Sequence, residues 1–277
     1  PLAAIAHYAC HPTTVGPDND LVTPDYPGVA KRVVEEATGS TCLFLQGAAG
    51  NVGPVYGTAR GGIDEYRPLG RRLGHETARV WHALDPLHRE SSYAGTLESG
   101  APLAMFDDEP SPRSPGLSVA TRELELPVRN LPDRQSVEEK YEAADDRLES
   151  LKAEGADEEE IREARMRAKR AKIQRDLVAE FGDREHLAFE LQTIAFGGVA
   201  LVAMPGEPFV ETGLRIKESS PFETTLFSGY SNVGHCYIPT AAAYDEGGYE
   251  VDRTPVRPGA VDRIVSETLD QLEALSG

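Results

Sequence analysis

Two short apolar segments on either side of Gly197-Gly198 constrain this chain more than any other feature. The stretch from Glu190 to Glu207 reads ELQTIAFGGVALVAMPGE, with Ile, Val, Leu and Phe gathered before and after the glycine pair. Because glycine tolerates a positive φ, a Gly-Gly pair between such runs predicts a β-hairpin with a two-residue turn. The second strand must end before Pro205, which cannot donate to a sheet ladder. The sequence therefore places Glu207 at the mouth of a buried strand.

A carboxylate at the mouth of a strand has two interpretations. It is either a working group that the scaffold holds in place, or a turn glutamate that faces water. The residues of the hairpin do not separate these two alternatives.

Composition limits the partners of the chain. Its 277 residues allow a sizeable core, and 46 acidic against 28 basic residues give a formal net charge of -18. Since phosphate binding depends on Lys and Arg, this balance argues against nucleic acid as a partner.

No apolar run approaches about 18 residues, so we expect no transmembrane segment. Three widely spaced cysteines, Cys10, Cys42 and Cys236, indicate reduced thiols, with a single disulfide as the alternative.

The chain opens on PLAAIAHYACHP, an apolar segment that predicts a strand from residue 2 to residue 10. There is no initiator Met and no signal peptide, so we expect N-terminal sequence to be missing, and the compartment stays open. Pro12 closes the strand and leaves His11 at its end. His7 and His11 lie four residues apart and would share a face, which suits either a metal pair or satisfied core histidines.

A glycine-rich loop follows the next predicted strand in the sequence CLFLQGAAGNVGP. Gly47, Gly50 and Gly53 would let backbone amides approach a ligand closely. Gln46 and Asn51 are either polar groups that position a ligand or capping amides of a tight turn.

The segment from about residue 135 to residue 182 predicts an inserted antiparallel helical hairpin. Val137, Tyr141, Ala144, Leu148 and Leu151 recur at helical spacing before a glycine break, and the pattern resumes to residue 181. Its dense charge indicates a solvated face; a lid or an arm for homo-oligomers is the alternative. The preceding residues, 100 to 134, read as a loop crossed by one strand at 119 to 126.

Together these patterns predict an α/β fold, in which a mixed sheet of short buried strands has flanking helices and the inserted hairpin. We expect one domain over residues 1 to 277. A final loop before the C-terminal helix carries several reactive side chains, namely His235, Tyr237, Tyr244, Tyr249 and Glu250. A histidine, a carboxylate and an oxygen donor at strand ends and glycine-framed loops suit zinc, although their spacing matches no local zinc motif.

Five blocks of sequence occur in the order typical of one family. They are ACHPT, TPDYPG, FLQGAAGNVGP, MPGEPFVETGLRIK and GYSNVGHCYIPT with the following GGYEV. The chain resembles the catalytic domain of the neutral/alkaline non-lysosomal ceramidases and their bacterial relatives over residues 2 to 55 and 190 to 252.

The resemblance implies a zinc-dependent amidase. In that family one zinc ion is held by two histidines, a glutamate and a tyrosine, and zinc-bound water attacks an amide carbonyl. The resemblance implies His11, Glu207 and Tyr249 as metal ligands here, with Tyr249 also able to stabilise the oxyanion. The other histidine belongs to an upstream His-x-His segment that this chain lacks. The implied substrate is an N-acyl compound, with a ceramide-like lipid as one class.

The resemblance also implies roles for further residues. Asn51 and His235 join Tyr249 as catalytic candidates, and the substrate-binding candidates are Gln46, Gly50, Gly53 and Tyr244. Gly53 stands where the ceramidases carry a serine that helps hold ceramide, which makes ceramide itself less secure as the substrate. A non-catalytic ligand-binding protein with the same fold is the alternative.

Overall fold

The computed structural model describes residues 2–16, 19, 21–55, 63–84, 89–110, 116–232 and 236–277. The chain divides into two compact units. Unit 1 comprises residues 1–8, 12–45 and 53–117, and unit 2 comprises residues 9–11, 46–52 and 118–277. The short segments 9–11 and 46–52 thus join unit 2, although the strands before them lie in unit 1.

Unit 1 contains two pairs of strands and two helices in its described residues. Its elements are β1 (Ala3–Tyr8), α1 (Asp25–Thr38), β2 (Thr41–Gln46, of which the last residue belongs to unit 2), α3 (Ile63–Ala83), β3 (Arg89–Glu98) and β4 (Pro102–Pro110). β1 pairs with β2, and α1 packs against α3. A small core of Ala4, Ala6, Val34 and Cys42 with the partly buried Trp81 lies between these elements. Burial of this apolar surface stabilises the unit.

The strands β3 and β4 form a hairpin that the sequence did not predict. They pair antiparallel from Arg89 opposite Pro110 to Glu98 opposite Pro102. Residues 100–134 were expected to be a loop with one strand, and this was wrong for β4. Many acidic residues and terminal prolines lower the strand signal, yet proline is tolerated at strand ends and cross-strand pairs such as Tyr93 with Phe106 support the ladder.

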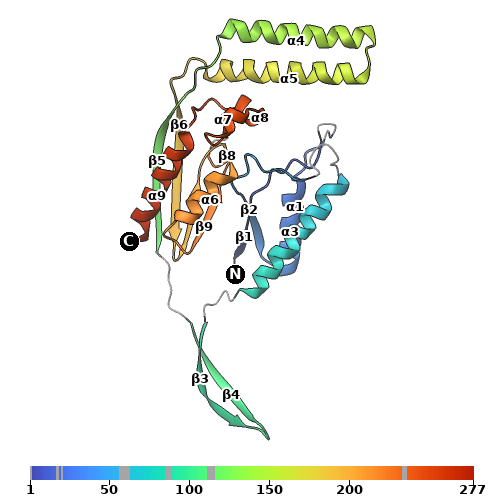
Figure 1. Cartoon of the computed structure of the whole chain (residues 1–277). Coiled ribbons are helices and arrows are strands. Elements are labelled where there is room, and N and C mark those ends of the chain that lie inside the picture. The colour runs from blue at the N-terminus through green and yellow to red at the C-terminus, as the bar shows by residue number, and fades with distance from the viewer. Residues whose placement is uncertain are drawn as a thin grey trace. The chain divides into compact units, whose positions relative to one another are not determined.

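Unit 2 is built on a four-stranded sheet in the order β5-β6-β7-β9 (Figure 1). Its elements are β5 (Leu117–Pro127, of which the first residue belongs to unit 1), α4 (Arg134–Glu154), α5 (Glu158–Phe181), β6 (His186–Phe196), β7 (Val199–Ala203), β8 (Glu207–Pro208), α6 (Val210–Ser219), β9 (Thr224–Ser228), β10 (Tyr237–Ile238), α7 (Ala243–Glu246), α8 (Tyr249–Asp252) and α9 (Ala260–Ser276). The sheet is mixed, because β6 and β7 are antiparallel whereas β7 and β9 are parallel.

The hairpin predicted at the glycine pair is confirmed. Phe196 lies opposite Val199 in the β6–β7 ladder, and Gly197 takes the left-handed conformation with φ of 59°. β7 ends at Ala203, before the proline, and Gly206 again has a positive φ of 74°. Glu207 follows in β8, which pairs in parallel with β10 so that Glu207 lies opposite Tyr237.

Helices α6 and α9 contact each other and the sheet (Figure 1). Alternate residues of β6, including Phe189 and Leu191, are fully buried with Ile264 and Leu272 of α9. Each such side chain contributes about 1.5–3 kcal/mol by leaving water. This packing stabilises the sheet whose inner strand β7 leads into β8.

The inserted helical hairpin consists of α4 and α5, as expected. Asp133 and Asp157 cap the two helices through their carboxylates, and Gly155 ends α4 with φ of 69°. Leu148, Leu151, Ala164 and Ala168 form the seam between the helices. The fold is therefore α/β, with flanking helices and an inserted helical hairpin.

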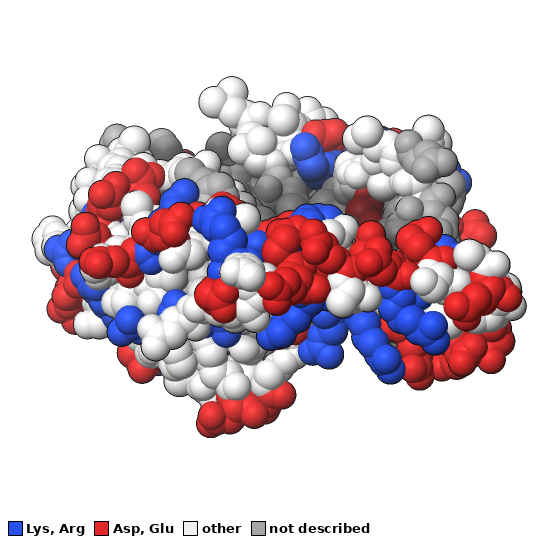
Figure 2. Space-filling model, turned by 90° about the horizontal axis from the view of Figure 1, so that it is seen from above, with Lys and Arg blue, Asp and Glu red and all other residues white. Residues whose placement is uncertain are grey.

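The surface charge and the buried thiols match what the composition predicts. Figure 2 shows acidic and basic side chains interleaved over the face that it presents. All three cysteines are buried thiols that form no disulfide among the described residues. Among the described residues, no helix is long and apolar enough to span a membrane.

Candidate metal centre

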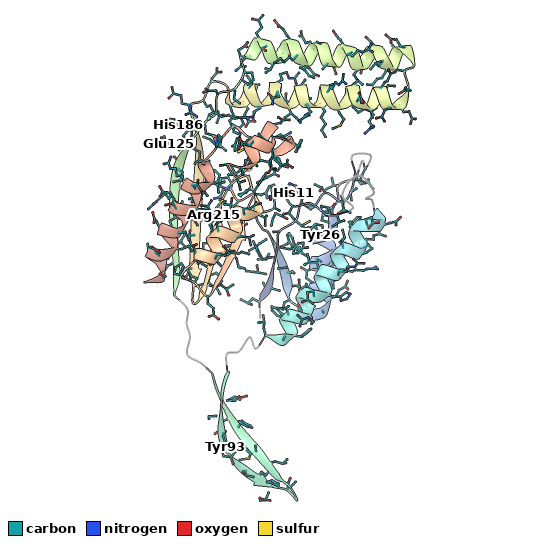
Figure 3. All side chains as sticks on the ribbon, viewed as in Figure 1. His11, Tyr26, Tyr93, Glu125, His186 and Arg215 are labelled. Atoms are coloured by element: carbon teal, nitrogen blue, oxygen red, sulfur yellow. The ribbon has the colours of Figure 1, made fainter. Side chains whose placement is uncertain are left out.

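His11 and Glu207 meet in unit 2 although they come from opposite ends of the chain. The Nε2 atom of His11 lies 2.8 Å from Oε2 of Glu207. Their side chains are 15% and 23% exposed, so both are shielded but reachable from solvent. Figure 3 shows His11 on the segment that follows β1. The backbone N–H of His11 donates to the carbonyl of Val52 at 2.8 Å, which ties this segment to the glycine-rich loop.

Two tyrosine hydroxyls complete the cluster. Tyr237 places its hydroxyl 3.2 Å from His11 Nε2, and its ring stacks on the imidazole with an interplanar angle of 5°. The hydroxyl of Tyr230 donates to Glu207 Oε2 at 2.8 Å and lies 3.3 Å from His11 Nε2. One nitrogen and three oxygens thus converge on a single point.

The backbone of Tyr230 is left-handed, with φ of 55°. This conformation is uncommon for a bulky residue, costs about 1–3 kcal/mol, and is concentrated at functional sites. The side chain is thereby aimed at Glu207 rather than along the loop.

Within the cluster, the pKa values of His11 and Glu207 shift in opposite directions, and each shift favours the charged form. The hydrogen bond that His11 donates to Glu207 raises the pKa of His11 above its ordinary value, against the lowering effect of burial, and the carbonyls of Ala49 and Val52 raise it further. Burial pushes the pKa of Glu207 up, but hydrogen bonds from His11, Tyr230 and Tyr237 outweigh it and hold that pKa below its ordinary value. In the absence of a metal the pair is therefore favoured as imidazolium and carboxylate.

The phenol of Tyr237 is strongly held in its neutral form. Burial is the main cause, and the adjacent negative charge of Glu207 adds to it, so that the pKa of Tyr237 lies well above its ordinary value. Without a cation, Tyr237 therefore acts as a hydrogen-bond donor toward the cluster.

Glycines allow the backbone to deliver these groups. The N–H of Gly50 donates to the carbonyl of Pro208 at 2.8 Å, and a Cβ on Gly50 would lie 2.3 Å from the carbonyl oxygen of Glu207. A Cβ on Gly206 would lie 2.6 Å from the carbonyl oxygen of Cys236. The segments that contain Gly50 and Gly206 thus approach neighbouring carbonyl oxygens so closely that both positions require glycine.

Gln46 and Asn51 act on the scaffold around the cluster. Gln46 Nε2 donates to the carbonyl of Cys10 at 3.0 Å, which holds the residue before His11. Asn51 accepts a hydrogen bond from the N–H of Val210 at 2.8 Å and donates to Glu211 at 3.0 Å, so it caps the start of α6.

The remaining predicted residues lie elsewhere or outside the described part. Tyr244 donates to the carbonyl of Val256 at 2.7 Å, an anchor for the segment before α9. Gly53 has open space where a side chain would begin, because no described heavy atom lies within 4 Å of the place that a Cβ would take. His235 lies outside the described residues.

Tyr249, the tyrosine ligand that the resemblance implies, contacts the ring of Tyr237, and Tyr237 in turn contacts His11. Its ring packs edge-on against Tyr237 with centroids 5.8 Å apart, and it is 44% exposed. The hydroxyl that lies on His11 belongs to Tyr237. Sequence reasoning gave no role to Tyr237 or Tyr230, although both lie in the block GYSNVGHCYIPT. The strand pairing of Tyr237 with Glu207 is the signal that was missing.

The donor set fits a small divalent cation. Zinc bonds to nitrogen and oxygen measure about 2.0–2.1 Å, so tetrahedral ligands lie roughly 3.3 Å apart. The separations from His11 Nε2 and Glu207 Oε2 to their neighbours, 2.8 to 3.3 Å, are close to this value. Among the described residues no group of three His, Cys, Asp or Glu is arranged for a metal. A cation here would depend on phenol oxygens as well.

Comparison with known proteins agrees with this architecture. No protein-family model and no curated protein matches the sequence. The structure resembles neutral ceramidase from Pseudomonas aeruginosa, with a TM-score of 0.58 and 17% identity over 99% of this chain and 44% of that one. It also resembles a ceramidase complexed with C2, with a TM-score of 0.58 and 18% identity over 99% and 45% of the two chains. The chain spans less than half the length of either protein, and its fold is ceramidase-like.

Proposed function

We propose that this chain is a zinc-dependent hydrolase that cleaves the amide bond of an N-acyl substrate, with ceramide-like lipids as one class. The observation that carries the proposal is the convergence of His11 Nε2, Glu207 Oε2 and the Tyr237 hydroxyl from three distant segments. The ceramidase-like fold supports it.

His11, Glu207 and Tyr237 would hold the ion, and Tyr230 adds a further oxygen beside Glu207. Bound zinc supplies a Lewis acid that lowers the pKa of water and polarises a carbonyl. Glu207 contributes a carboxylate that is already ionised, and His11 must release its proton before its Nε2 can bind a cation.

Other residues orient the substrate and the ligands in this proposal. Tyr249, which is exposed beside Tyr237, would donate to the developing oxyanion of the substrate. Gln46, Gly50 and Asn51 hold the His11 segment, β8 and α6 in register, so they position the ligands. Any role of His235, Tyr244 or Gly53 toward substrate remains a prediction from the resemblance.

The proposal is tested by hydrolysis of an N-acylsphingosine and a simple N-acyl amide, with release of fatty acid as the readout. We expect zinc-dependent turnover in the wild type and a loss of about 100-fold or more in Glu207→Gln. Glu218→Gln, which alters an exposed glutamate of α6, is the matched control and should keep full activity. Equal activity of Glu207→Gln and wild type would contradict the proposal.

A second candidate function is ligand binding without chemistry. It is favoured by the presence of only two His, Cys, Asp or Glu side chains in the described cluster and by Gly53 at the position of the family serine. This alternative predicts binding of N-acyl compounds with no turnover at any zinc concentration. Turnover that depends on Glu207 would eliminate it.

A further inference from the structure

Helix α5 carries a concentration of positive charge that is unusual for this chain. From Arg162 to Arg175 there are seven Lys and Arg residues and one acid, Glu163, whereas the whole chain has 28 basic and 46 acidic residues. Among the described residues, a single ion pair, between Arg175 and Glu138 at 3.8 Å, joins α5 to α4. Packing of the hairpin therefore does not account for this charge.

One face of α5 lines a pocket in unit 2 with a volume of about 470 Å³. Five charged residues of α5 line it together with Met166 and Ile173 of the same helix and Tyr249 of α8, and the charged residues are Arg162, Glu163, Arg167, Lys169 and Arg170. The single carboxylate, Glu163, is paired with Arg167 at 3.2 Å. Because a helix rises about 1.5 Å per residue, the stretch from Arg162 to Ile173 is roughly 16 Å long. The pocket thus combines a net positive charge with the exposed side chain of Met166 and the buried Ile173.

Ion pairs leave part of this charge available. Arg170 is held by Asp252 at 3.1 Å, which fastens α5 to α8. Within α5, Arg162 pairs with Glu159, Arg167 with Glu163, and both Lys172 and Arg175 with Asp176. Among the described residues, Lys169 has no carboxylate within ion-pair distance. Arg162 and Lys169 are both exposed, so an incoming anion can reach them.

Tyr249 connects this pocket to the metal centre. It lines the pocket, and its ring touches that of Tyr237, whose hydroxyl lies on His11. Tyr249 is therefore the residue shared by the pocket and the aromatic contacts of the cluster.

We infer that the pocket is a subsite for the anionic headgroup of an N-acyl substrate, so that the chain acts on negatively charged N-acyl amphiphiles. Arg162 and Lys169 pair with a carboxylate or a phosphate, since guanidinium and ammonium groups are the side chains that bind such anions. Met166, the exposed apolar side chain of the pocket, contacts the neighbouring carbon chain. This inference rests on the proposed amidase site, because the amide is placed at the cluster.

Binding by metal-free protein tests the subsite independently of turnover. The probes are N-octanoylglycine, N-octanoylethanolamine and the phosphate monoester of the latter, which share the acyl amide and differ in the terminal group. We expect both anionic probes to bind the wild type about fivefold more tightly than the neutral one, as two exposed charged contacts would give. A preference for only one of them identifies that anion as the headgroup.

The double variant Arg162→Gln/Lys169→Gln should lose this preference. Lys140→Gln/Lys152→Gln removes the same charge from α4 and should retain it. Equal binding of charged and neutral probes by the wild type, or equal loss of preference in both variants, would overturn the subsite. So would binding of anionic phospholipid vesicles, but not of the monomeric probes, through Arg162 and Lys169, which would assign the face to a membrane.

This binding experiment, combined with the hydrolysis assay of the zinc-loaded protein, separates the two proposals. A preference for anionic probes without hydrolysis of any N-acyl compound leaves the subsite and removes the proposed hydrolase. Hydrolysis with no preference for anionic probes leaves the hydrolase and removes the subsite.

Discussion

His11 Nε2 and Glu207 Oε2 lie 2.8 Å apart across 196 residues of sequence. Neither residue belongs to a local zinc motif: His11 follows β1, and Glu207 is the first residue of β8. The hydrogen bond raises the pKa of His11 and contributes to lowering that of Glu207, so each stabilises the charged form of the other. The relationship is the basis for the predictions that follow.

In metal-free protein this pair should stabilise the fold in a defined pH range. The pKa of His11 is raised, so its stabilisation is complete below 6.5 and is lost as pH rises through the raised value. The pKa of Glu207 is lowered, so its stabilisation is complete above 4.5 and is lost as pH falls through the lowered value. The pair therefore contributes most between pH 4.5 and pH 6.5.

Urea unfolding of the wild type and Glu207→Gln at several pH values measures this contribution. We expect a difference in unfolding free energy of about 1–2 kcal/mol in that range, and a smaller difference toward pH 9 and below pH 4. A difference that stays constant across pH would show that the interaction is not ionic.

The two tyrosines near the cluster should have separable roles. Tyr237→Phe removes a hydroxyl that lies 3.2 Å from His11 Nε2, so zinc affinity should fall about 10- to 100-fold. Tyr249→Phe should leave zinc affinity unchanged and lower the rate of hydrolysis, because Tyr249 contacts the ring of Tyr237 from outside the cluster. Zinc titration and steady-state kinetics on both variants check this; the reverse pattern would assign the ligand to Tyr249.

Gly50 should be far less tolerant of substitution than its neighbour Gly53. In Gly50→Ala the new Cβ would meet the carbonyl oxygen of Glu207 at 2.3 Å, which forces the backbone apart and should cost about 2–3 kcal/mol. Gly53→Ala is the control, because no described atom lies within 4 Å of its Cβ position. Thermal unfolding of the two variants is the measurement, and equal midpoints would contradict the close approach.

The Cys236 thiol should be inert in the folded chain. Burial is the main cause that raises the pKa of Cys236 to about 12, and the negative charge of Glu207 adds to it. We therefore expect no alkylation of this thiol by iodoacetamide at about pH 8.5 unless the protein is unfolded. Mass spectrometry of the peptide that contains Cys236 reads the result, and rapid labelling of native protein would show that the segment opens.

Local patterns were sufficient for the elements that depend on nearby residues. The glycine pair at 197–198, the helical spacing before and after Gly155 and the C-terminal helix all appear where they were expected. These features depend on turn chemistry and on hydrophobic periodicity, both of which are properties of short segments.

The cluster itself depends on contacts between distant segments. The sequence pointed to His11 and Glu207 as strand-end groups and, through resemblance, to Tyr249. It could not indicate that β10 pairs with β8 and thereby sets Tyr237 opposite Glu207. It also could not indicate the left-handed backbone that turns Tyr230 toward Glu207, because tyrosine seldom adopts this conformation.

Zinc titration of metal-free protein by calorimetry is the decisive measurement for the metal centre, with the wild type compared with His11→Gln and Glu207→Gln. We expect one ion per wild-type chain, and affinity about 100-fold or more weaker in each variant. Absence of zinc binding by the wild type, or equal affinity in all three proteins, would contradict a metal centre at His11 and Glu207.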